Sequence, residues 1–346
     1  MLGKTLYSEL EQCVKGLKEY MNKGVKEPEQ PIEETPVFEE VKVEKFRSFR
    51  PSRPRGRFLS VDASSYPLLT ANNWRIGVSR CAYVVVEVKG ENPTIVDEGY
   101  EDHLFQVVCS PRERPYAVWD KLRRFESELA LKLIRGFDEE DFCLLDGAAY
   151  FGGSRSFTLD LYDEAKRRNL QIVMIPKNSP RLRDSRGRDL LANLSLAGSK
   201  LQFAGRLWET WIYYPIKMAE IKSLNLYAKV SCVKLSPSSP RVFRCDIADY
   251  LLGEDEAGVA VRIASELAYL SRDARCDGYP APLYLAHQRT RIPESKLIEY
   301  EELVYRRLGE EGILDELLRE AEVAGFRKTL LGLLHDYEWF EELPEL

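Results

Sequence analysis

The hydrophobic pattern changes its period several times along the chain, and these changes predict the order of helices and strands. Residues 1–24 place apolar side chains such as Leu6 and Leu10 at three- and four-residue intervals, which is typical of an amphipathic helix. From Phe58 onward, apolar runs rich in β-branched and aromatic residues predict strands. The segment 81–88 is almost continuously apolar, which indicates a strand in the centre of a sheet.

The predicted elements of the central region follow one another as three strands, a helix, a strand, a helix and a strand. The strands are expected at about 58–62, 75–88, 93–98, 141–146 and 170–175, and the helices at about 117–136 and 158–169. A strand meander followed by α/β alternation matches a ribonuclease H-like core. We therefore predict an α/β fold with a mixed sheet flanked by helices.

The remaining sequence predicts additional strands and a helical C-terminal part. The strands are expected at about 210–215, 226–234 and 241–245, and the helices at about 257–273, 281–291, 295–308, 311–324 and 327–336. The resulting organisation is an N-terminal helix over 1–24, a Pro/Glu-rich linker and basic arm over 25–57, a core domain over 58–292 and a C-terminal helical segment over 293–346.

Composition narrows the class of protein. Hydrophobic residues make up 44% of the 346 residues, which predicts a globular chain. The sequence contains no apolar run of about 18 residues and no apolar signal core at its N-terminus, so we expect a soluble, cytoplasmic protein. The formal net charge of −6 argues against a generally basic surface, but not against a local basic channel.

The metal-ligating residues argue against zinc. The seven cysteines are scattered without a CxxC pair, and the chain has three histidines. A structural zinc site is therefore not expected. We expect most of the cysteines to be small buried hydrophobic residues.

Two aspartates occur in matching contexts. Asp62 and Asp146 each end an apolar strand-like run and are each followed by small residues. A strand-end aspartate is also a common turn former, so either one alone is a weak signal. A buried carboxylate needs a cation or a donor, and two in comparable settings favour one shared cation over two independent turns.

Glu126 is the candidate for a third carboxylate. It shares one face of the predicted helix with Leu122, Leu129 and Leu133, which are four residues before, three after and seven after it. Glu128 lies among basic residues and is expected to face solvent. The alternative is that Glu126 is a rim residue paired with Arg123.

Several basic residues are candidates for phosphate contact. Lys177 and Arg181 follow the predicted strand 170–175, and Arg53, Arg55 and Arg57 belong to the basic arm before the first strand of the core. Lys177 can hold a phosphate or stabilise charge in a transition state. For both groups the alternative is a solvated loop.

Tyr279 and His287 lie in the sequence Gly278-Tyr-Pro-Ala-Pro-Leu-Tyr-Leu-Ala-His287. A histidine on a helix is more often structural than catalytic, but this one has Arg289 and Arg291 beside it. It can ligate a cation or act as an acid or base near neutral pH. Tyr279 can position a phosphate or stack on a base.

Together these motifs resemble the NurA family of DNA-end nucleases over about residues 58–292. The matching segments are Val61-Asp62-Ala63-Ser64, Arg124-Phe125-Glu126, Leu144-Leu145-Asp146-Gly147 and Gly278-Tyr279-Pro280-Ala281-Pro282 with Ala286-His287. The last segment is the most specific. The chain departs from the family at Ala63, where the family typically has glycine.

The resemblance implies an activity and a cellular context. Asp62, Glu126, Asp146 and His287 would bind Mn²⁺ or Mg²⁺, and Tyr279 would complete the site. The family implies a homodimeric ring that cuts single-stranded DNA endonucleolytically and digests single- and double-stranded ends 5′ to 3′. It also implies a hexameric HerA-type ATPase partner, association with the nucleoid, and end resection beside the double-strand-break repair nuclease–ATPase complex.

The expected mechanism is phosphodiester hydrolysis assisted by two divalent ions held by Asp62, Asp146 and Glu126. One alternative is a DNA-end-binding subunit of a translocase with little activity of its own, and another is a ribonuclease on the same core. The chain has no GxxxxGK[ST] motif, so ATP hydrolysis is not expected. The amphipathic stretch from Leu314 to Phe340 is predicted to pack on the core, with a dimer or ATPase-docking surface as the alternative.

Overall fold

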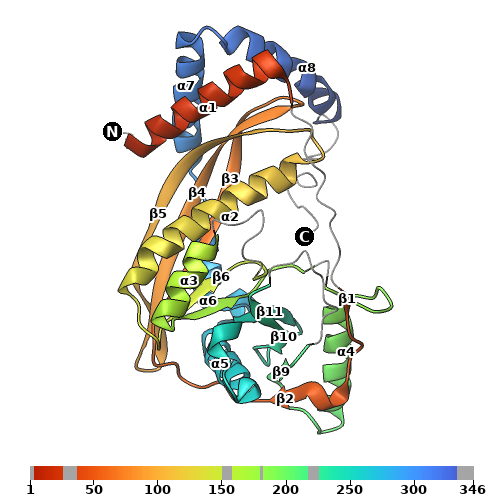
Figure 1. Cartoon of the computed structure of the whole chain (residues 1–346). Coiled ribbons are helices and arrows are strands. Elements are labelled where there is room, and N and C mark those ends of the chain that lie inside the picture. Colours follow the sequence, from red (N-terminus) through yellow and green to blue (C-terminus); the bar gives the residue numbers. More distant parts are fainter. Residues whose placement is uncertain (1–3, 26–36, 150–157, 180–181, 217–225, 333–346) are drawn as a thin grey trace.

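The computed structural model describes residues 4–25, 37–149, 158–179, 182–216 and 226–332 (Figure 1). Nine strands form one mixed sheet in the order β2-β9-β10-β11-β7-β6-β3-β4-β5, and β1 and β8 pair separately. The strand bounds are β1 Val37–Phe38, β2 Phe46–Ser48, β3 Phe58–Thr70, β4 Trp74–Lys89, β5 Asn92–Val108, β6 Phe142–Leu145, β7 Gln171–Met174, β8 Arg183–Asp184, β9 Trp211–Tyr213, β10 Ala228–Lys234 and β11 Phe243–Ala248.

The order of the central strands establishes the fold class. Strands β3, β4 and β5 form an antiparallel meander, and β6 and β7 then add in parallel on the other side of β3. The spatial order β5-β4-β3-β6-β7 is that of a ribonuclease H-like core, as the hydrophobic pattern predicts. The chain is thus a mixed α/β protein whose nine-stranded sheet is flanked by helices.

Helices cover both faces of this sheet (Figure 1). Their bounds are α1 Lys4–Lys23, α2 Arg114–Leu133, α3 Leu159–Arg168, α4 Leu190–Phe203, α5 Glu256–Leu270, α6 Ala281–Arg289, α7 Glu294–Glu310 and α8 Leu314–Gly332. Side chains of α2 and α3 pack on one face with Leu59 and Val61. Side chains of α5 and α6 pack on the other face with Phe58 and Phe142.

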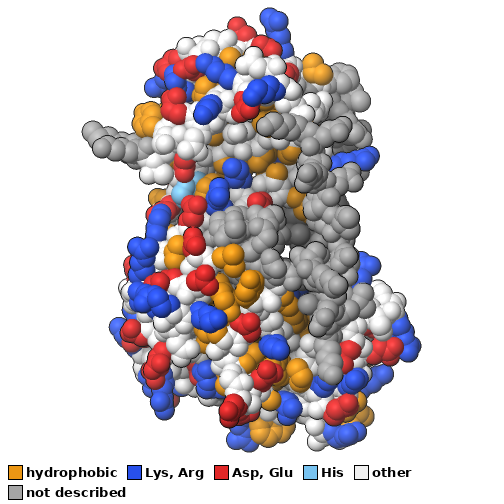
Figure 2. Space-filling model, viewed as in Figure 1, with side chains coloured by type: hydrophobic (Ala, Val, Ile, Leu, Met, Phe, Trp, Pro, Cys, Tyr) orange, Lys and Arg blue, Asp and Glu red, His pale blue; other side chains and the backbone are white. Residues whose placement is uncertain are grey.

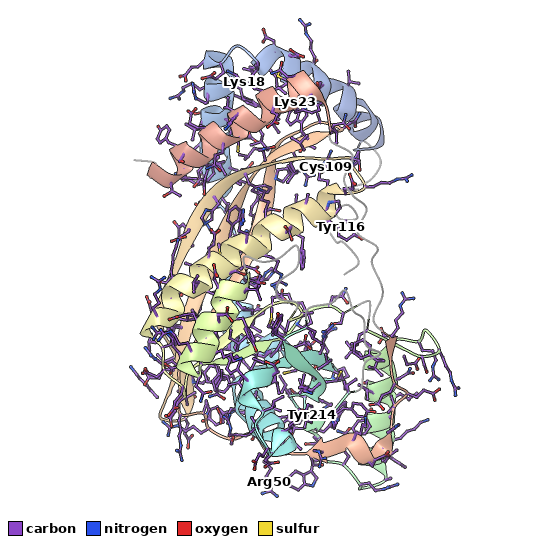
Figure 3. The ribbon with its side chains drawn as sticks, in the orientation of Figure 1. Lys18, Lys23, Arg50, Cys109, Tyr116 and Tyr214 are labelled. Atoms are coloured by element: carbon purple, nitrogen blue, oxygen red, sulfur yellow. The ribbon has the colours of Figure 1, made fainter. Side chains whose placement is uncertain are left out.

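The long strands β3, β4 and β5 extend beyond the rest of the sheet to a separate helical layer. There α1, α7 and α8 enclose the far ends of these strands around Trp74, Ile76 and Leu104 (Figure 1). Figure 3 labels Lys18 and Lys23 on α1 at this end of the molecule. No helix among the described residues is long and apolar enough to cross a membrane.

Several predicted elements differ from those observed. Strand β3 continues to Thr70 and β5 spans Asn92–Val108, because both pair along the length of β4. Helix α8 is continuous over Leu314–Gly332, where the sequence predicts two helices. The range 25–57, predicted as linker and arm, contributes β1 and β2. Helix α4 was not predicted, although Asp189 caps it by accepting the Ala192 amide and its leucines recur at helical spacing.

The cysteines behave as the composition predicts. All seven are free thiols, and six of them are buried. Cys81, Cys143 and Cys245 lie in the two cores on either side of the sheet. Burial raises the pKa of the Cys143 thiol to about 12, so this side chain acts as a small hydrophobic group.

Candidate active site

Asp62, Asp146 and Lys177 meet where the parallel strands β6 and β7 end. The Lys177 ammonium Nζ lies 2.8 Å from Asp62 Oδ2 and 2.9 Å from Asp146 Oδ2. The pairing of β3 with β6 ends at Val61 and Leu145, so each aspartate directly follows the last paired residue. Because β3 and β6 are parallel and pair up to Val61 and Leu145, the next residues of the two segments, 84 positions apart in sequence, meet there.

Strand alternation puts these three side chains on the same face of the sheet. Asp62 is four residues after Phe58 on β3, so the two side chains point to the same face, and Phe58 packs in the core beneath α5 and α6. Asp146 is likewise two residues after Leu144, and Lys177 is two residues after Ile175. Leu144 and Ile175 belong to the same core as Phe58. The Lys177 backbone amide also donates to Asp146 Oδ1 at 2.9 Å. The face covered by α6 therefore carries the two carboxylates and their shared cation.

His287 reaches the same cluster from α6. Its Nδ1 lies 2.7 Å from Asp62 Oδ2 and 3.1 Å from Lys177 Nζ. An ammonium only donates and a carboxylate only accepts, so one Nδ1 cannot bond to both. The shorter contact assigns the proton to Nδ1, which donates to Asp62. The second nitrogen, Nε2, is then the acceptor, on a side chain that is 46% exposed.

Two hydrogen bonds fix α6 over the sheet end. At its start, the Tyr279 hydroxyl donates to the Ile175 carbonyl at 2.6 Å, which ties the helix to the end of β7. At its end, the Thr290 and Ser64 hydroxyls are 2.7 Å apart, which ties the helix to β3. His287 is thereby held between the strands that carry Lys177 and Asp62.

Glu126 approaches from the opposite face, on α2. Its Oε1 accepts the backbone amide of Ala63 at 3.0 Å, in the register where β6 has ended and provides no partner. Its Oε2 accepts from Arg123 Nη1 at 2.8 Å. Glu126 is buried, whereas Glu128 is exposed and 3.8 Å from Arg124. The structure therefore brings Glu126, and not Glu128, to the end of the sheet.

The charged groups in this cluster shift one another's pKa values. Burial by itself would raise the pKa of Asp62, but the hydrogen bond from His287 and the charge of Lys177 outweigh it and lower that pKa. Burial would lower the pKa of Lys177, but the charges of Asp146 and Asp62 outweigh it and raise that pKa. Asp62 is thus held ionised and Lys177 protonated, so the pair is a preformed ion pair.

Glu126 is shifted in the opposite direction. Burial is the largest cause and raises its pKa to about 8. The positive charge of Arg123 opposes this shift, whereas the negative charges of Asp62 and Asp146 add to it. A further positive charge near these three carboxylates would favour the ionised form of Glu126.

This shift predicts how stability depends on pH in the absence of divalent cations. The folded Glu126 carboxyl keeps its proton up to a pKa of about 8, whereas the unfolded one releases it at its ordinary value of 4.5. Between these values the folded state binds more protons, so the contribution of Glu126 to stability is lost as pH rises. In chelator, Glu126→Gln should flatten the fall in the free energy of unfolding between about pH 5 and pH 8, measured by denaturant titration. Glu128→Gln is the control and should retain the wild-type slope.

The donor set fits a hard divalent cation. Two carboxylates that already share one positive atom are arranged as ligands of a single cation, and Mg²⁺ is commonly held by one or two carboxylates together with substrate phosphates. Both oxygens of Glu126 are occupied by protein donors in this arrangement. Within the described residues, no group of three or more His, Cys, Asp or Glu side chains is placed to hold a metal ion, so the fit rests on the two aspartates.

The prediction that Tyr279 stacks on a base is wrong. Its ring is only 7% exposed and packs against Phe243 at a centroid distance of 5.3 Å. Its hydroxyl is bonded to Ile175, so it does not face the carboxylates as a phosphate donor. Tyr279 instead holds the start of α6. The prolines that follow it begin this helix, because proline is preorganised for the first helical turn.

The basic arm does not lie beside the carboxylates. Arg57 binds the carboxylate of Asp141, with its Nη2 at 2.6 Å from Oδ2, and stacks on Phe137. This pair precedes β6, whereas Asp146 follows it, so Arg57 lies about 16 Å along β3 from Asp62. Arg53 donates to the Val88 carbonyl, and Arg55 is exposed. Figure 3 shows Arg50 of the same arm at the end of the molecule opposite α1.

Lys177 and Arg181 are the other two basic residues that the sequence suggested for phosphate contact. Lys177 has its ammonium between two carboxylates. Arg181 lies outside the described residues. On the face drawn in Figure 2, Lys and Arg side chains alternate with Asp and Glu at both ends of the molecule. The sequence therefore identified these basic side chains as candidates but did not predict the carboxylates that Arg57 and Lys177 bind.

Comparisons with known proteins give the following matches. No protein-family model matches the sequence. The comparison with curated proteins also finds no match. Among solved structures, the chain is similar to the NurA nuclease from Sulfolobus solfataricus, with 14% identity, coverage of 90% of this chain and 98% of that chain, and a TM-score of 0.49.

Two more solved structures are similar over most of their length. A second NurA structure has 8% identity, with 87% of this chain and 93% of that chain covered, at a TM-score of 0.44. The catalytic domain of human Endonuclease V has 15% identity, with 89% of this chain and 99% of that chain covered, at a TM-score of 0.41. The family named from the sequence motifs thus also occurs among the similar structures.

Proposed function

We propose that this protein is a metal-dependent nuclease that hydrolyses phosphodiester bonds in DNA. The observation that carries the proposal is the convergence of Asp62 and Asp146 on one cationic position at the end of β6, with His287 beside it. Paired carboxylates of this kind serve as ligands of the cations that assist phosphoryl transfer. The two carboxylates are arranged to bind a positive charge at the position that the Lys177 ammonium occupies in this structure.

The carboxylates of Asp62 and Asp146 would hold Mn²⁺ or Mg²⁺, and Glu126 and His287 are the further candidate ligands. When bound, such an ion acts as a Lewis acid on the phosphate and lowers the pKa of a bound water. Two ions are expected, as in many nucleases. Because Lys177 now neutralises both aspartates, we propose that its ammonium turns away from them toward the substrate phosphate.

The remaining residues position groups and move protons. Asp62 fixes the His287 ring through Nδ1, so that Nε2 can accept a proton from water or return one to the leaving oxygen. Lys177 neutralises charge that develops on the phosphate oxygens. Tyr279 and Thr290 hold α6 in place, so that His287 stays at a fixed distance from the sheet.

The finer features of the proposal rest on the sequence motifs shared with the NurA family. We propose single-strand endonuclease activity and 5′ to 3′ exonuclease activity on single- and double-stranded DNA. We also propose a homodimer that works with a hexameric HerA-type ATPase in the resection of DNA double-strand breaks, beside the double-strand-break repair nuclease–ATPase complex. The cellular location would be the nucleoid.

The experiment that tests the proposal is digestion of end-labelled DNA. Single-stranded DNA with a 5′ or a 3′ label, and RNA of the same sequence, are incubated with the wild type in Mn²⁺, Mg²⁺ or chelator. We expect cleavage of DNA in Mn²⁺ and none in chelator, because without a divalent ion nothing polarises the phosphate or lowers the pKa of the attacking water. The pattern of labelled products gives the polarity.

Other outcomes identify the competing functions. A mobility shift of DNA in chelator without cleavage in either metal would contradict the nuclease and identify a DNA-end-binding subunit. Faster cleavage of RNA than of DNA would identify a ribonuclease on the same core. Cleavage that persists in chelator would contradict metal dependence.

A further inference from the structure

We infer that Arg123 is a positioning residue that fixes the Glu126 carboxylate at the end of the sheet. The absence of a side chain at Gly147 leaves space for the Arg123 guanidinium. The inference deepens the proposed function, because it assigns a residue that organises the carboxylate site from the face opposite α6. The sequence offered the pairing of Arg123 with Glu126 only as the alternative for a rim residue, and it assigned no role to Gly147.

Arg123 is partly buried beside the carboxylates. Its side chain is 13% exposed, and its Nη1 donates to Glu126 Oε2 at 2.8 Å. The negative charges of Glu126, Asp146 and Asp62 all act on its guanidinium. A buried guanidinium with this many acidic neighbours is held by their charge, and in return it holds the nearest of them in place.

The arrangement of α2 explains how Arg123 is oriented. Trp119, Arg123 and Glu126 are spaced by four and three residues, so they form one stripe on the helix. The guanidinium carbon lies 5.2 Å from the centre of the Trp119 ring, which stabilises a cation. Arg123 is therefore fixed between an aromatic ring and a carboxylate, and Glu126 is fixed between Arg123 and the Ala63 amide.

Gly147 provides the second, independent observation. Its φ is +113°, in the region that favours glycine. A Cβ built on it would lie 1.7 Å from Arg123 Nη2 and 2.4 Å from Arg123 Cζ. A side chain at residue 147 is therefore disfavoured by the backbone φ and also by the Arg123 guanidinium, which occupies the position of its Cβ. Through this contact, Arg123 links the segment that follows β6 to Glu126 on α2.

The test measures the position of Glu126 and the binding of Mn²⁺ in separate experiments. The first experiment records the amide signal of Ala63 in protein labelled with ¹⁵N-alanine, assigned by its loss in Ala63→Gly. The second records free Mn²⁺ by electron paramagnetic resonance during a titration of the protein. The variants are Arg123→Gln, Arg123→Lys and the matched control Arg124→Gln, which changes an exposed arginine one residue further along α2.

We expect Arg123→Gln to shift the Ala63 signal and to weaken Mn²⁺ binding by about 10- to 100-fold, the range found when a ligand loses its outer partner. Arg123→Lys should recover part of both effects, because it restores a positive charge without the planar guanidinium. Arg124→Gln should match the wild type. Arg123→Gln with an unchanged Ala63 signal and Mn²⁺ affinity within about twofold of the wild type would overturn the inference.

Gly147→Ala tests the steric half of the inference. The added methyl group must displace the guanidinium, so this variant should move the Ala63 signal as Arg123→Gln does. The double variant should shift it no further, because both changes act on one contact. Independent, additive shifts would overturn the link between Gly147 and Arg123. The backbone strain at φ +113° is present in both Gly147 variants, so the deciding comparison is between Gly147→Ala and the double variant.

Failure of the proposed function is distinguishable from failure of this inference. If the wild type neither binds Mn²⁺ nor cleaves nucleic acid, the nuclease proposal fails. The Ala63 signal still decides the role of Arg123 in that case, because it reports a hydrogen bond within the protein. A shift in Arg123→Gln supports the positioning role, and an unchanged signal overturns it.

Discussion

Asp62→Asn is expected to abolish metal-dependent cleavage while the protein stays folded. Asp62 is 4% exposed, contacts both Lys177 and His287, and lies on β3 directly after the last residue that pairs with β6. Asparagine keeps the shape but removes the negative charge that a cation requires. A loss of several kcal/mol in transition-state stabilisation corresponds to a fall in kcat of about a thousandfold or more. The measurement is single-turnover cleavage of labelled single-stranded DNA in Mn²⁺.

The fold should survive this change because the neighbours of Asp62 keep other partners. Lys177 retains Asp146, and the asparagine oxygen can still accept the proton of His287 Nδ1. Thermal unfolding should therefore show a stability within about 1–2 kcal/mol of the wild type. Asp97→Asn is the matched control, since Asp97 is an exposed residue on β5, and it should cleave normally. Full activity of Asp62→Asn would contradict the assignment of the site.

Arg244→Met is expected to destabilise the protein more than any surface change. Arg244 and Asp246 form a bidentate pair on β11, with two N–O distances of 2.7 Å, and their side chains are 6% and 0% exposed. Removing the arginine leaves a buried carboxylate without its cation, which costs about 3–5 kcal/mol. Denaturant unfolding gives this difference directly.

The Arg244–Asp246 pair also bears on the site. Asp246 Oδ2 accepts the backbone amide of Ala149 at 3.0 Å, three residues after Asp146. Arg244→Met should therefore lower both stability and cleavage. The control is Arg241→Met, because the Arg241–Asp277 pair near the start of the same strand is exposed, and exposed pairs contribute less than about 1 kcal/mol. Equal stability of the two variants would show that the buried pair has no such role.

The strands and helices of the core were predictable because their patterns are local. The apolar run 81–88 is a buried strand that pairs on both sides, with β3 and β5, but it lies next to the edge of the nine-stranded sheet and not at its centre. The helix that carries Glu126 was predicted from its leucines. The lengths of β3 and β5 were not predictable, since their exposed and polar ends are strands only because β4 pairs with them.

The candidate site was partly predictable for the same reason. Asp62 and Asp146 stand out because the pattern of an aspartate that follows an apolar run and precedes small residues occurs twice. Their approach to one another depends on parallel pairing of β3 with β6, which the order of elements implied. Whether any of these side chains is catalytic stays a prediction, for which the cleavage experiments are the test.

The sequence by itself determined most helices and strands of the core and which carboxylates follow apolar runs, because these features depend on short-range patterns. Only the tertiary structure decided the partners of the charged residues. It placed Lys177 between two aspartates, paired Arg57 with Asp141 and put Arg123 against Gly147. The physical reason is that a long basic side chain has several acidic groups within reach, and the one it binds depends on which strands and helices are neighbours in space.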